Sequence, residues 1–300
     1  MIGRLDHVAL GVQDLTEAAA RWSEQFGLRV RELTEQRALL SCDDEPYCLE
    51  LLGGVPVGLH HVGWELRRGV GPERFGDPDQ QGSAWISDAD GNRIELMPHR
   101  EPVSNLVPHA RPVVNPAPGH PRKLGHVNFL TGNLDAQLRF YHETLGMRIT
   151  DWLGAGGVWL YTGTDHHVMA LIDKGAPHFH HLAFDVVDIG QMRMALDHLG
   201  RHGRWLGWGP VRHGVGGNIA SYVRILEEEC FVELYCDMEQ LQADHEPRRW
   251  PDNRYSSNTW GPLPPRSYFR FDTAAIESER ESLEMQGVPL APAGASEVLS

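Results

Sequence analysis

The sequence contains an internal repeat with an offset of about 120 residues. Residues 5–30, LDHVALGVQDLTEAAARWSEQFGLRV, share one pattern with residues 124–149, LGHVNFLTGNLDAQLRFYHETLGMRI. In both segments an alternating strand with one histidine precedes a polar turn, an amphipathic helix and a new strand. Later strands repeat as well, GLHHVGWEL (58–66) as HFHHLAFDV (178–186) and GNRIELMP (91–98) as CFVELYCD (230–237). Each half of the chain is therefore predicted to contain two strand–helix–strand units.

The two helices of the long repeat carry start and stop signals. Asp14, followed three residues later by Glu17, predicts a capped start for the first helix, and Asn133 predicts the same for the second. Gly27 and Gly146 mark the ends. We therefore expect one helix after each histidine-bearing strand.

Length and proline content divide the chain into regions. A chain of 300 residues is twice the usual length of about 150 residues per domain. The stretch HREPVSNLVPHARPVVNPAPGHPR has six prolines and no periodicity, which is typical of an extended linker. We predict an N-terminal domain at 1–100, a linker at 101–121, a C-terminal domain at 122–240 and a tail rich in proline and aromatic residues at 241–300.

Composition excludes several classes of partner. The chain has 27 Lys and Arg against 41 Asp and Glu, a formal charge of −14 that repels nucleic-acid phosphates and anionic membranes. No stretch approaches the roughly 20 apolar residues of a membrane-spanning helix, and the N-terminus runs directly into a strand, so we expect a cytoplasmic protein without a signal peptide. The cysteines form no C-x-x-C motif, which predicts reduced thiols packed in strands at Cys42, Cys48, Cys230 and Cys236.

Three residues of the second half have the chemistry of a metal site. His126 lies in the first strand, a double histidine opens a later strand, and Glu233 lies in the last strand. Two histidines and one carboxylate form the facial triad that holds Fe(II) and leaves three coordination positions open. The alternation of side chains along a strand does not decide between His180 and His181.

These motifs resemble the vicinal oxygen chelate superfamily and, within it, the two-domain type I extradiol dioxygenases of the catechol 2,3-dioxygenase and 2,3-dihydroxybiphenyl dioxygenase kind, over residues 3–270. The resemblance implies an α+β fold with two domains, each of two βαβββ modules. It implies Fe(II), in preference to Mn(II), in the C-terminal domain only. It assigns the metal ligands to L-G-H-V-N-F, H-H-L-A-F and V-E-L-Y, which are His126, His181 and Glu233.

The same resemblance implies three catalytic residues. His167, in His-Val-Met-Ala-Leu, matches the acid/base histidine of the family, with a spacing to His181 that is one residue shorter. His213 and Tyr222 match a histidine and a tyrosine nine residues apart. In the same region, three histidines receive no role and are interpreted as partly exposed or as hydrogen-bonding neighbours: His166, His178 and His180.

Two features depart from the family pattern or leave an alternative open. The loop before Glu233 is one residue longer than the usual D-P-x-G turn, so Glu227, Glu228 and Glu229 are alternative carboxylates. In the tail, aromatic residues predict a lid over the site or, equally, an arm that packs the domains together: Trp250, Tyr255, Trp260 and Phe269.

The first half retains His7, His61 and Glu95, but the position that matches His167 falls near Tyr47, and no histidine–tyrosine pair follows. We interpret this set as a vestige of duplication without catalysis, and a second metal there stays possible.

The resemblance implies an Fe(II)-dependent dioxygenase that uses O2 to cleave a catechol ring beside the diol. We expect a catecholic substrate, a homo-oligomer and no contact with nucleic acid or membrane. Two alternatives stay open: a non-oxidative glyoxalase-like isomerase or thiol transferase, and a metal-free protein that binds an aromatic drug.

Overall fold

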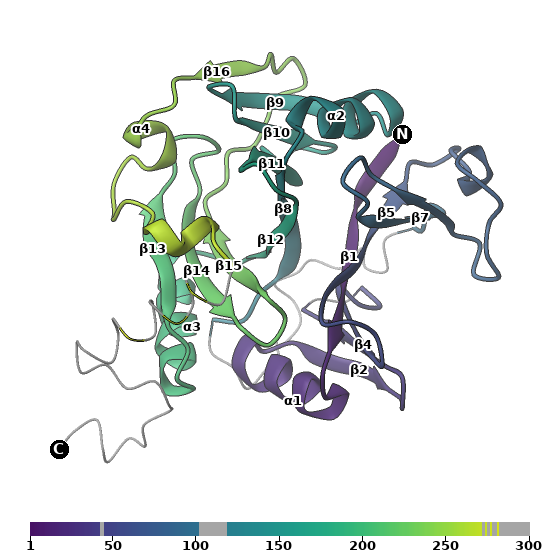
Figure 1. Cartoon of the computed structure of the whole chain (residues 1–300), viewed down its shortest axis with the longest axis horizontal. Helices are drawn as coiled ribbons and strands as arrows, with labels where there is room; N and C mark the ends of the chain where they lie inside the picture. Colours follow the sequence, from purple (N-terminus) through teal and green to yellow (C-terminus); the bar gives the residue numbers. More distant parts are fainter. Residues whose placement is uncertain (43–44, 102–118, 272–273, 275–276, 278–280, 282–300) are drawn as a thin grey trace.

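The structure is a computed structural model that describes residues 1–42, 45–101 and 119–271, with 274, 277 and 281. Most of the predicted linker (101–121) and the end of the predicted tail (241–300) lie outside these residues. Two mixed β-sheets, each with helices beside it, make up the α+β fold. Figure 1 shows the purple-to-blue first half beside the teal-to-yellow second half.

The first half forms a sheet of seven strands in the order β2-β3-β4-β1-β5-β7-β6. Its first unit has the expected βαβββ sequence: β1 (Ile2–Val12), α1 (Leu15–Phe26), β2 (Arg29–Leu33), β3 (Arg37–Ser41) and β4 (Leu49–Gly53). The predicted cap of α1 is confirmed, because Asp14 Oδ1 accepts a hydrogen bond from Glu17 N at 2.9 Å and Gly27 ends the helix at φ 70°.

The second unit of the first half is shorter than the βαβββ module we expected. It has β5 (Gly58–Leu66), β6 (Ala84–Ser87) and β7 (Arg93–Met97), with one 3₁₀ turn (Pro72–Arg74) where a helix would stand. The connecting residues 67–83 are rich in glycine and proline, which oppose a longer helix.

The second half forms a sheet of nine strands in the order β13-β14-β15-β12-β8-β11-β10-β9-β16. Both of its units are complete βαβββ modules. The first comprises β8 (Lys123–Thr131), α2 (Leu134–Leu138) with a π-helical continuation (Arg139–Thr144), β9 (Arg148–Leu153), β10 (Gly157–Tyr161) and β11 (Met169–Asp173). The second comprises β12 (His178–Asp185), α3 (Ile189–Arg201), β13 (Leu206–Arg212), β14 (Ile219–Ile225) and β15 (Cys230–Cys236).

The tail returns to the second sheet. Its strand β16 (Arg248–Trp250) pairs with β9, and a short helix α4 (Arg254–Ser257) and a 3₁₀ turn (Arg266–Phe269) follow. Trp208 Nε1 donates to the carbonyl of Pro262 at 2.8 Å, which ties the tail to β13. In Figure 1 this yellow-green segment crosses the face of the second half.

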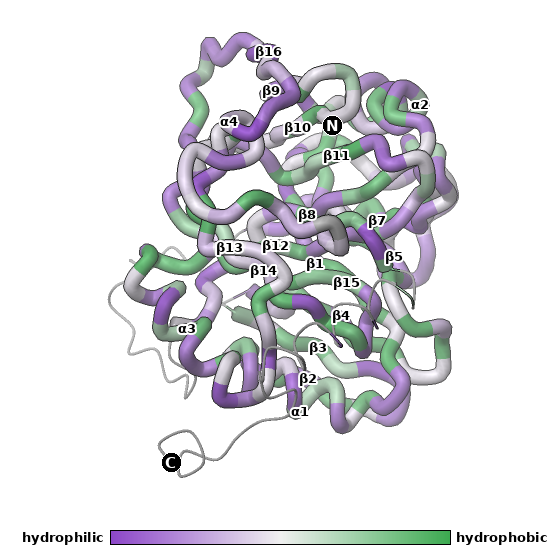
Figure 2. The backbone as a smooth tube through the Cα atoms, turned by 60° about the vertical axis from the view of Figure 1, so that its left-hand side comes forward, coloured by the Kyte–Doolittle hydropathy of each residue, from purple (hydrophilic) through white to green (hydrophobic). Residues whose placement is uncertain are grey.

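Buried side chains of both halves form one continuous core. Trp22 and Phe26 of α1, for example, belong to the same buried cluster as Phe184 of β12. In Figure 2 the central strands β1, β4 and β15 are largely coloured as hydrophobic. The four cysteines are buried thiols that form no disulfide bond, and none of the helices that the structure describes is long and apolar enough to cross a membrane.

A buried ion pair joins the halves. The guanidinium of Arg21 on α1 donates to both carboxylate oxygens of Glu228, at 3.0 and 2.5 Å, in the turn between β14 and β15. The side chains are 6% and 1% exposed, so neither charge has water as an alternative partner. Glu228 also belongs to the loop that is one residue longer than the family pattern.

Replacing Arg21 with Met should therefore destabilise the protein by about 3–5 kcal/mol, because Glu228 is left buried without its main cation. Urea denaturation followed by circular dichroism measures the change. The matched control is Arg193→Met. Arg193 and Asp197 form an exposed pair on α3, so this change should lower the free energy of unfolding by less than about 1 kcal/mol. Equal shifts in the two variants would contradict this account.

Candidate metal centre and active site

Three central strands bring His126, His181 and Glu233 together. In the register of the second sheet, His126 on β8 lies opposite Ala183 on β12, and Ala183 lies opposite Glu233 on β15. Glu233 Oε2 is 3.0 Å from His126 Nε2 and 3.1 Å from His181 Nε2. The three side chains are at most 5% exposed, and their donor atoms lie within 4.8 Å of one another.

The alternative carboxylates in the preceding loop are engaged elsewhere. Glu227 receives two hydrogen bonds from Arg204 at 2.8 and 2.9 Å, and Glu228 pairs with Arg21. Glu229 is exposed in the turn, with φ 55°. Of the four glutamates considered, Glu233 is the one that the structure brings to the two histidines.

His180 lies behind His181 and orients it. His180 Nε2 is 2.8 Å from the carbonyl oxygen of Tyr268, so this nitrogen carries the proton, and His180 Nδ1 is 2.8 Å from His181 Nδ1. Burial lowers the pKa of both rings, so both are neutral. His181 then donates from Nδ1 to His180, which leaves its Nε2 unprotonated and directed at Glu233.

The donor set fits a divalent metal ion. His181 Nε2 is buried and has no hydrogen-bond partner in the described structure, although the Glu233 carboxylate is 3.1 Å away. An unprotonated nitrogen and a carboxylate oxygen are both acceptors, and a metal cation held between them satisfies both. Two imidazole nitrogens and one carboxylate oxygen are the donors of the non-haem Fe(II) facial triad.

A cavity of about 350 Å³ opens beside this cluster. All six predicted site residues line it: His126, His167, His181, His213, Tyr222 and Glu233. From the tail, Asp252, Ser256, Ser257, Tyr268 and Phe269 line it as well. Of the four tail aromatics that we considered, Phe269 alone is part of this wall, whereas Tyr255 and Trp260 are 60% and 46% exposed.

His167 is held by a chain of two further buried groups. His167 Nδ1 is 3.0 Å from His166 Nδ1, and His166 Nε2 is 3.1 Å from Asp151 Oδ2 on β9. Asp151 accepts a hydrogen bond from His166 Nε2, so His166 Nδ1 is the nitrogen that can accept a hydrogen bond from His167 Nδ1. Burial lowers the pKa of His167 well below its ordinary value, which leaves His167 neutral with an unprotonated Nε2.

His213 and Tyr222 form a direct hydrogen bond. His213 Nε2 is 2.8 Å from the Tyr222 hydroxyl, and His213 Nδ1 is 2.6 Å from the carbonyl oxygen of Ser257. The carbonyl oxygen accepts a hydrogen bond from His213 Nδ1–H. His213 Nε2 therefore carries no proton and accepts a hydrogen bond from the Tyr222 hydroxyl. Burial raises the pKa of Tyr222 well above its ordinary value and keeps the phenol protonated.

The structure revises the interpretation of the three histidines without a role. His178 is half-buried, bonds to the Glu229 carbonyl and stacks on Phe271, as expected for a partly exposed side chain. His166 and His180 are 0% and 1% exposed, so partial exposure was wrong for them, whereas hydrogen bonding to site residues is confirmed.

Sequence reasoning missed other residues of the site. Asn218 donates to Glu233 Oε1 at 3.1 Å, and its position between His213 and Tyr222 is the signal that could have found it. Asp151 and Tyr268 come from distant segments and carry no local signal.

The corresponding residues of the first half also come together. His7 Nε2 and His61 Nε2 are 2.9 Å apart, and Glu95 Oε2 lies 3.5 and 3.4 Å from them. Glu50 joins this cluster, which the sequence did not indicate, because its Oε2 is 3.8 Å from His61 Nε2.

Comparisons with known proteins find similar sequences and similar folds. Residues 123–224 match the family model of the Glyoxalase/Bleomycin resistance protein/Dioxygenase superfamily. Metapyrocatechase 2 of Cupriavidus necator is 28% identical over 308 residues, which covers 89% of this chain and 91% of that protein.

Two solved structures resemble the whole fold. The anaerobic substrate complex of homoprotocatechuate 2,3-dioxygenase from Brevibacterium fuscum has a TM-score of 0.76 at 21% identity and covers 89% of this chain and 91% of that one. The Mn(II)-bound glyoxalase from Novosphingobium aromaticivorans has a TM-score of 0.74 at 20% identity and covers 89% and 93%. Residues 123–224 are therefore similar to the domain of the Glyoxalase/Bleomycin resistance protein/Dioxygenase superfamily, and the chain as a whole shares its fold with solved structures of extradiol dioxygenases.

Proposed function

We propose that this protein is an extradiol dioxygenase that uses Fe(II) and O2 to cleave a catechol-type ring beside its diol. The observation that carries the proposal is the cluster of His126, His181 and Glu233 at the wall of a cavity of about 350 Å³. These three residues would hold the metal, and a facial triad would leave coordination positions open for substrate and dioxygen. The name metapyrocatechase of the curated relatives supports this reaction class.

The volume of the cavity favours a small substrate. Ligand pockets span about 300–1,000 Å³, and this cavity lies at the lower end of that range. When bound to the three ligands, Fe(II) would supply a Lewis acid for the diol and open positions for dioxygen. Proton transfer and the orientation of the diol are assigned to side chains of this chain.

His167 is proposed as the acid/base. Its Nε2 is unprotonated, so it can accept a proton from a substrate hydroxyl and later return it. The ring stands against His126, with ring centroids 4.3 Å apart, so the proton would be held next to the metal ligands. Asp151 and His166 are proposed as positioning residues, because they fix which nitrogen of His167 carries its proton.

Tyr222 and His213 are proposed to orient the diol. The Tyr222 hydroxyl donates its proton to His213, so its oxygen can accept a hydrogen bond from a substrate hydroxyl. Tyr268 packs edge-on against Tyr222, with ring centroids 5.1 Å apart, and closes this side of the cavity. Tail residues thereby reduce the access of water to reactive species.

The reaction itself can be tested on the purified full chain. The protein is loaded with Fe(II) without air, mixed with a catechol and then exposed to O2, while oxygen uptake and the absorbance of a yellow ring-opened product are recorded. We expect one O2 consumed per product formed, and activity lost with a chelator and restored by Fe(II). Ligand binding without oxygen uptake would favour the drug-binding alternative, and a metal-dependent isomerisation would favour the glyoxalase-like one.

Removing one proposed ligand should remove the iron of the second half. His126→Ala, His181→Ala and Glu233→Ala should each lose this metal and activity, because two donors on an open site bind weakly. Iron is measured by mass spectrometry after gel filtration. Glu229→Ala, a change of an exposed carboxylate in the loop before β15, is the matched control and should retain both. Full iron in the Glu233 variant would refute the assignment.

His167→Gln separates proton transfer from metal binding. Iron content should stay at the wild-type level, whereas the rate of ring cleavage should fall by about 10²–10⁴-fold, because a placed proton-transfer group contributes that much. His166→Gln should lower the rate less and leave catechol binding unchanged. Loss of iron from the His167 variant would make His167 a ligand, and an unchanged rate would remove it from the mechanism.

A further inference from the structure

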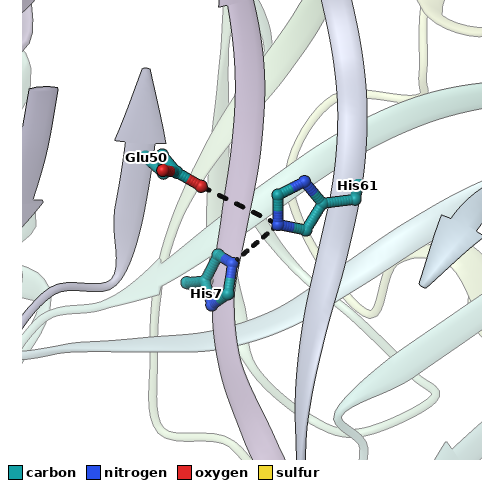
Figure 3. Close-up of side chains that lie close together, drawn as sticks. All are labelled: His7, Glu50 and His61. Carbon is teal, nitrogen blue, oxygen red and sulfur yellow. Dashed lines mark hydrogen bonds and ion pairs between the residues drawn. The ribbon is translucent and has the colours of Figure 1, made fainter. Parts of the chain in front are cut away.

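A second group of metal-ligating side chains lies in the middle of the first sheet. Figure 3 shows His7 of β1, Glu50 of β4 and His61 of β5 pointing toward one another, and their donor atoms lie within 4.8 Å. Glu95 of β7 approaches both histidines, at 3.5 and 3.4 Å. We propose that these four residues bind a divalent transition-metal ion of the zinc class in a closed, structural site that takes no substrate.

The distances suit four donors around one small ion. Zinc binds nitrogen and oxygen ligands at about 2.0–2.2 Å in a tetrahedron, which separates neighbouring donors by about 3.3–3.6 Å. The contacts of Glu95 with His7 and His61 fall close to this range. The Glu50–His61 contact is longer, at 3.8 Å, and the His7–His61 contact is shorter, at 2.9 Å, so the side chains would have to rotate for all four donors to bind one ion.

A carboxylate outside the cluster prepares His7 as a ligand. His7 Nδ1 is 2.9 Å from Asp6 Oδ1, and Asp6 also pairs with Arg100. The carboxylate accepts a hydrogen bond from His7 Nδ1–H, so the lone pair of His7 Nε2 points into the cluster. A histidine ligand oriented by a carboxylate is a recurrent feature of metal sites. The repeat-equivalent position of the second half is Gly125, so this feature belongs to the first half alone.

The charges of the cluster call for a cation. Glu50 and Glu95 are each 9% exposed, and they face two imidazole rings that are at most 3% exposed. Arg37 Nη1 lies 3.8 Å from Glu50 Oε1, outside the cluster and half-exposed, so it balances at most one of the two carboxylates.

The register of the sheets shows why this site is closed. Ala9 pairs with Glu50 in the first sheet as Asn128 pairs with Ala170 in the second, so Glu50 occupies the position of Ala170. Ala170 lines the cavity of about 350 Å³ in the second half, whereas the matching position of the first half carries the carboxylate of Glu50, 3.8 Å from His61 Nε2. Three residues earlier, Tyr47 replaces His167 and packs on His7, with ring centroids 4.8 Å apart. Four protein ligands without an open position distinguish structural from catalytic zinc sites.

The experiment must exclude metal bound in the second half. The full chain is therefore prepared as the His126→Ala/His181→Ala variant, stripped with a chelator and titrated with Zn²⁺ or Co²⁺ alone. We expect about one equivalent to remain bound after gel filtration, the visible bands of four-coordinate Co²⁺, and a higher melting temperature with Zn²⁺. Because this variant lacks two ligands of the proposed active site, the result is independent of whether the protein is a dioxygenase.

Three changes in the same background locate the metal. Glu50→Gln and His61→Gln, which preserve size, should each abolish the bound equivalent and the thermal shift. Asp6→Asn should weaken binding by about 10–100-fold. Tyr47→Phe is the matched control, since it keeps the ring on His7 and removes no donor, and should bind as the background does. No binding in the background variant, or binding that survives both Glu50→Gln and His61→Gln, would overturn the proposal.

Discussion

Each of the two clusters of histidines and glutamates depends on the pairing of three strands at the centre of its sheet. An antiparallel contact between β8 and β12 and a parallel contact between β12 and β15 set His126 and Glu233 on either side of Ala183. Side chains alternate between faces along a strand, so a slip of one residue would send a ligand to the opposite face. The same pairing in the first sheet sets His7 and Glu95 beside Gly63. Backbone hydrogen bonds thus determine where the ligands converge.

Around this frame, acceptors from distant segments determine which nitrogen of each buried ring carries its proton. The carbonyl of Tyr268 does so for His180, the carbonyl of Ser257 for His213 and the carboxylate of Asp151 for His166. Two of these acceptors belong to the tail, so the tail contributes to the chemistry of the site as well as to its wall. Besides covering the site or packing against the sheet, the tail therefore fixes the proton positions of two buried histidines.

The two halves show how one duplicated frame supports different sites. Ala170 is small, and its side of the second sheet faces a cavity. Glu50 stands at the same register position of the first sheet and brings a fourth donor to the histidines. This position is one at which the two sites differ, and Tyr47 in place of His167 is another. The longer loop before β15 has a different use, because its Glu228 binds Arg21 of the other half.

The sequence by itself determined the repeat, its strand–helix–strand units and the cap of α1, since alternation and capping are local properties. The α+β class and the six residues that share the cavity followed from the resemblance of its motifs to a known family. The sequence did not predict that the second unit of the first half lacks a helix, although the glycines and prolines at 67–83 account for it. Only the tertiary structure placed His181, and not His180, beside Glu233, engaged Glu227 and Glu228 elsewhere, and brought Asp151, Tyr268 and Glu50 to their histidines. These decisions depend on contacts between residues far apart in the chain, and such contacts exist only after the strands have paired and the tail has packed against them.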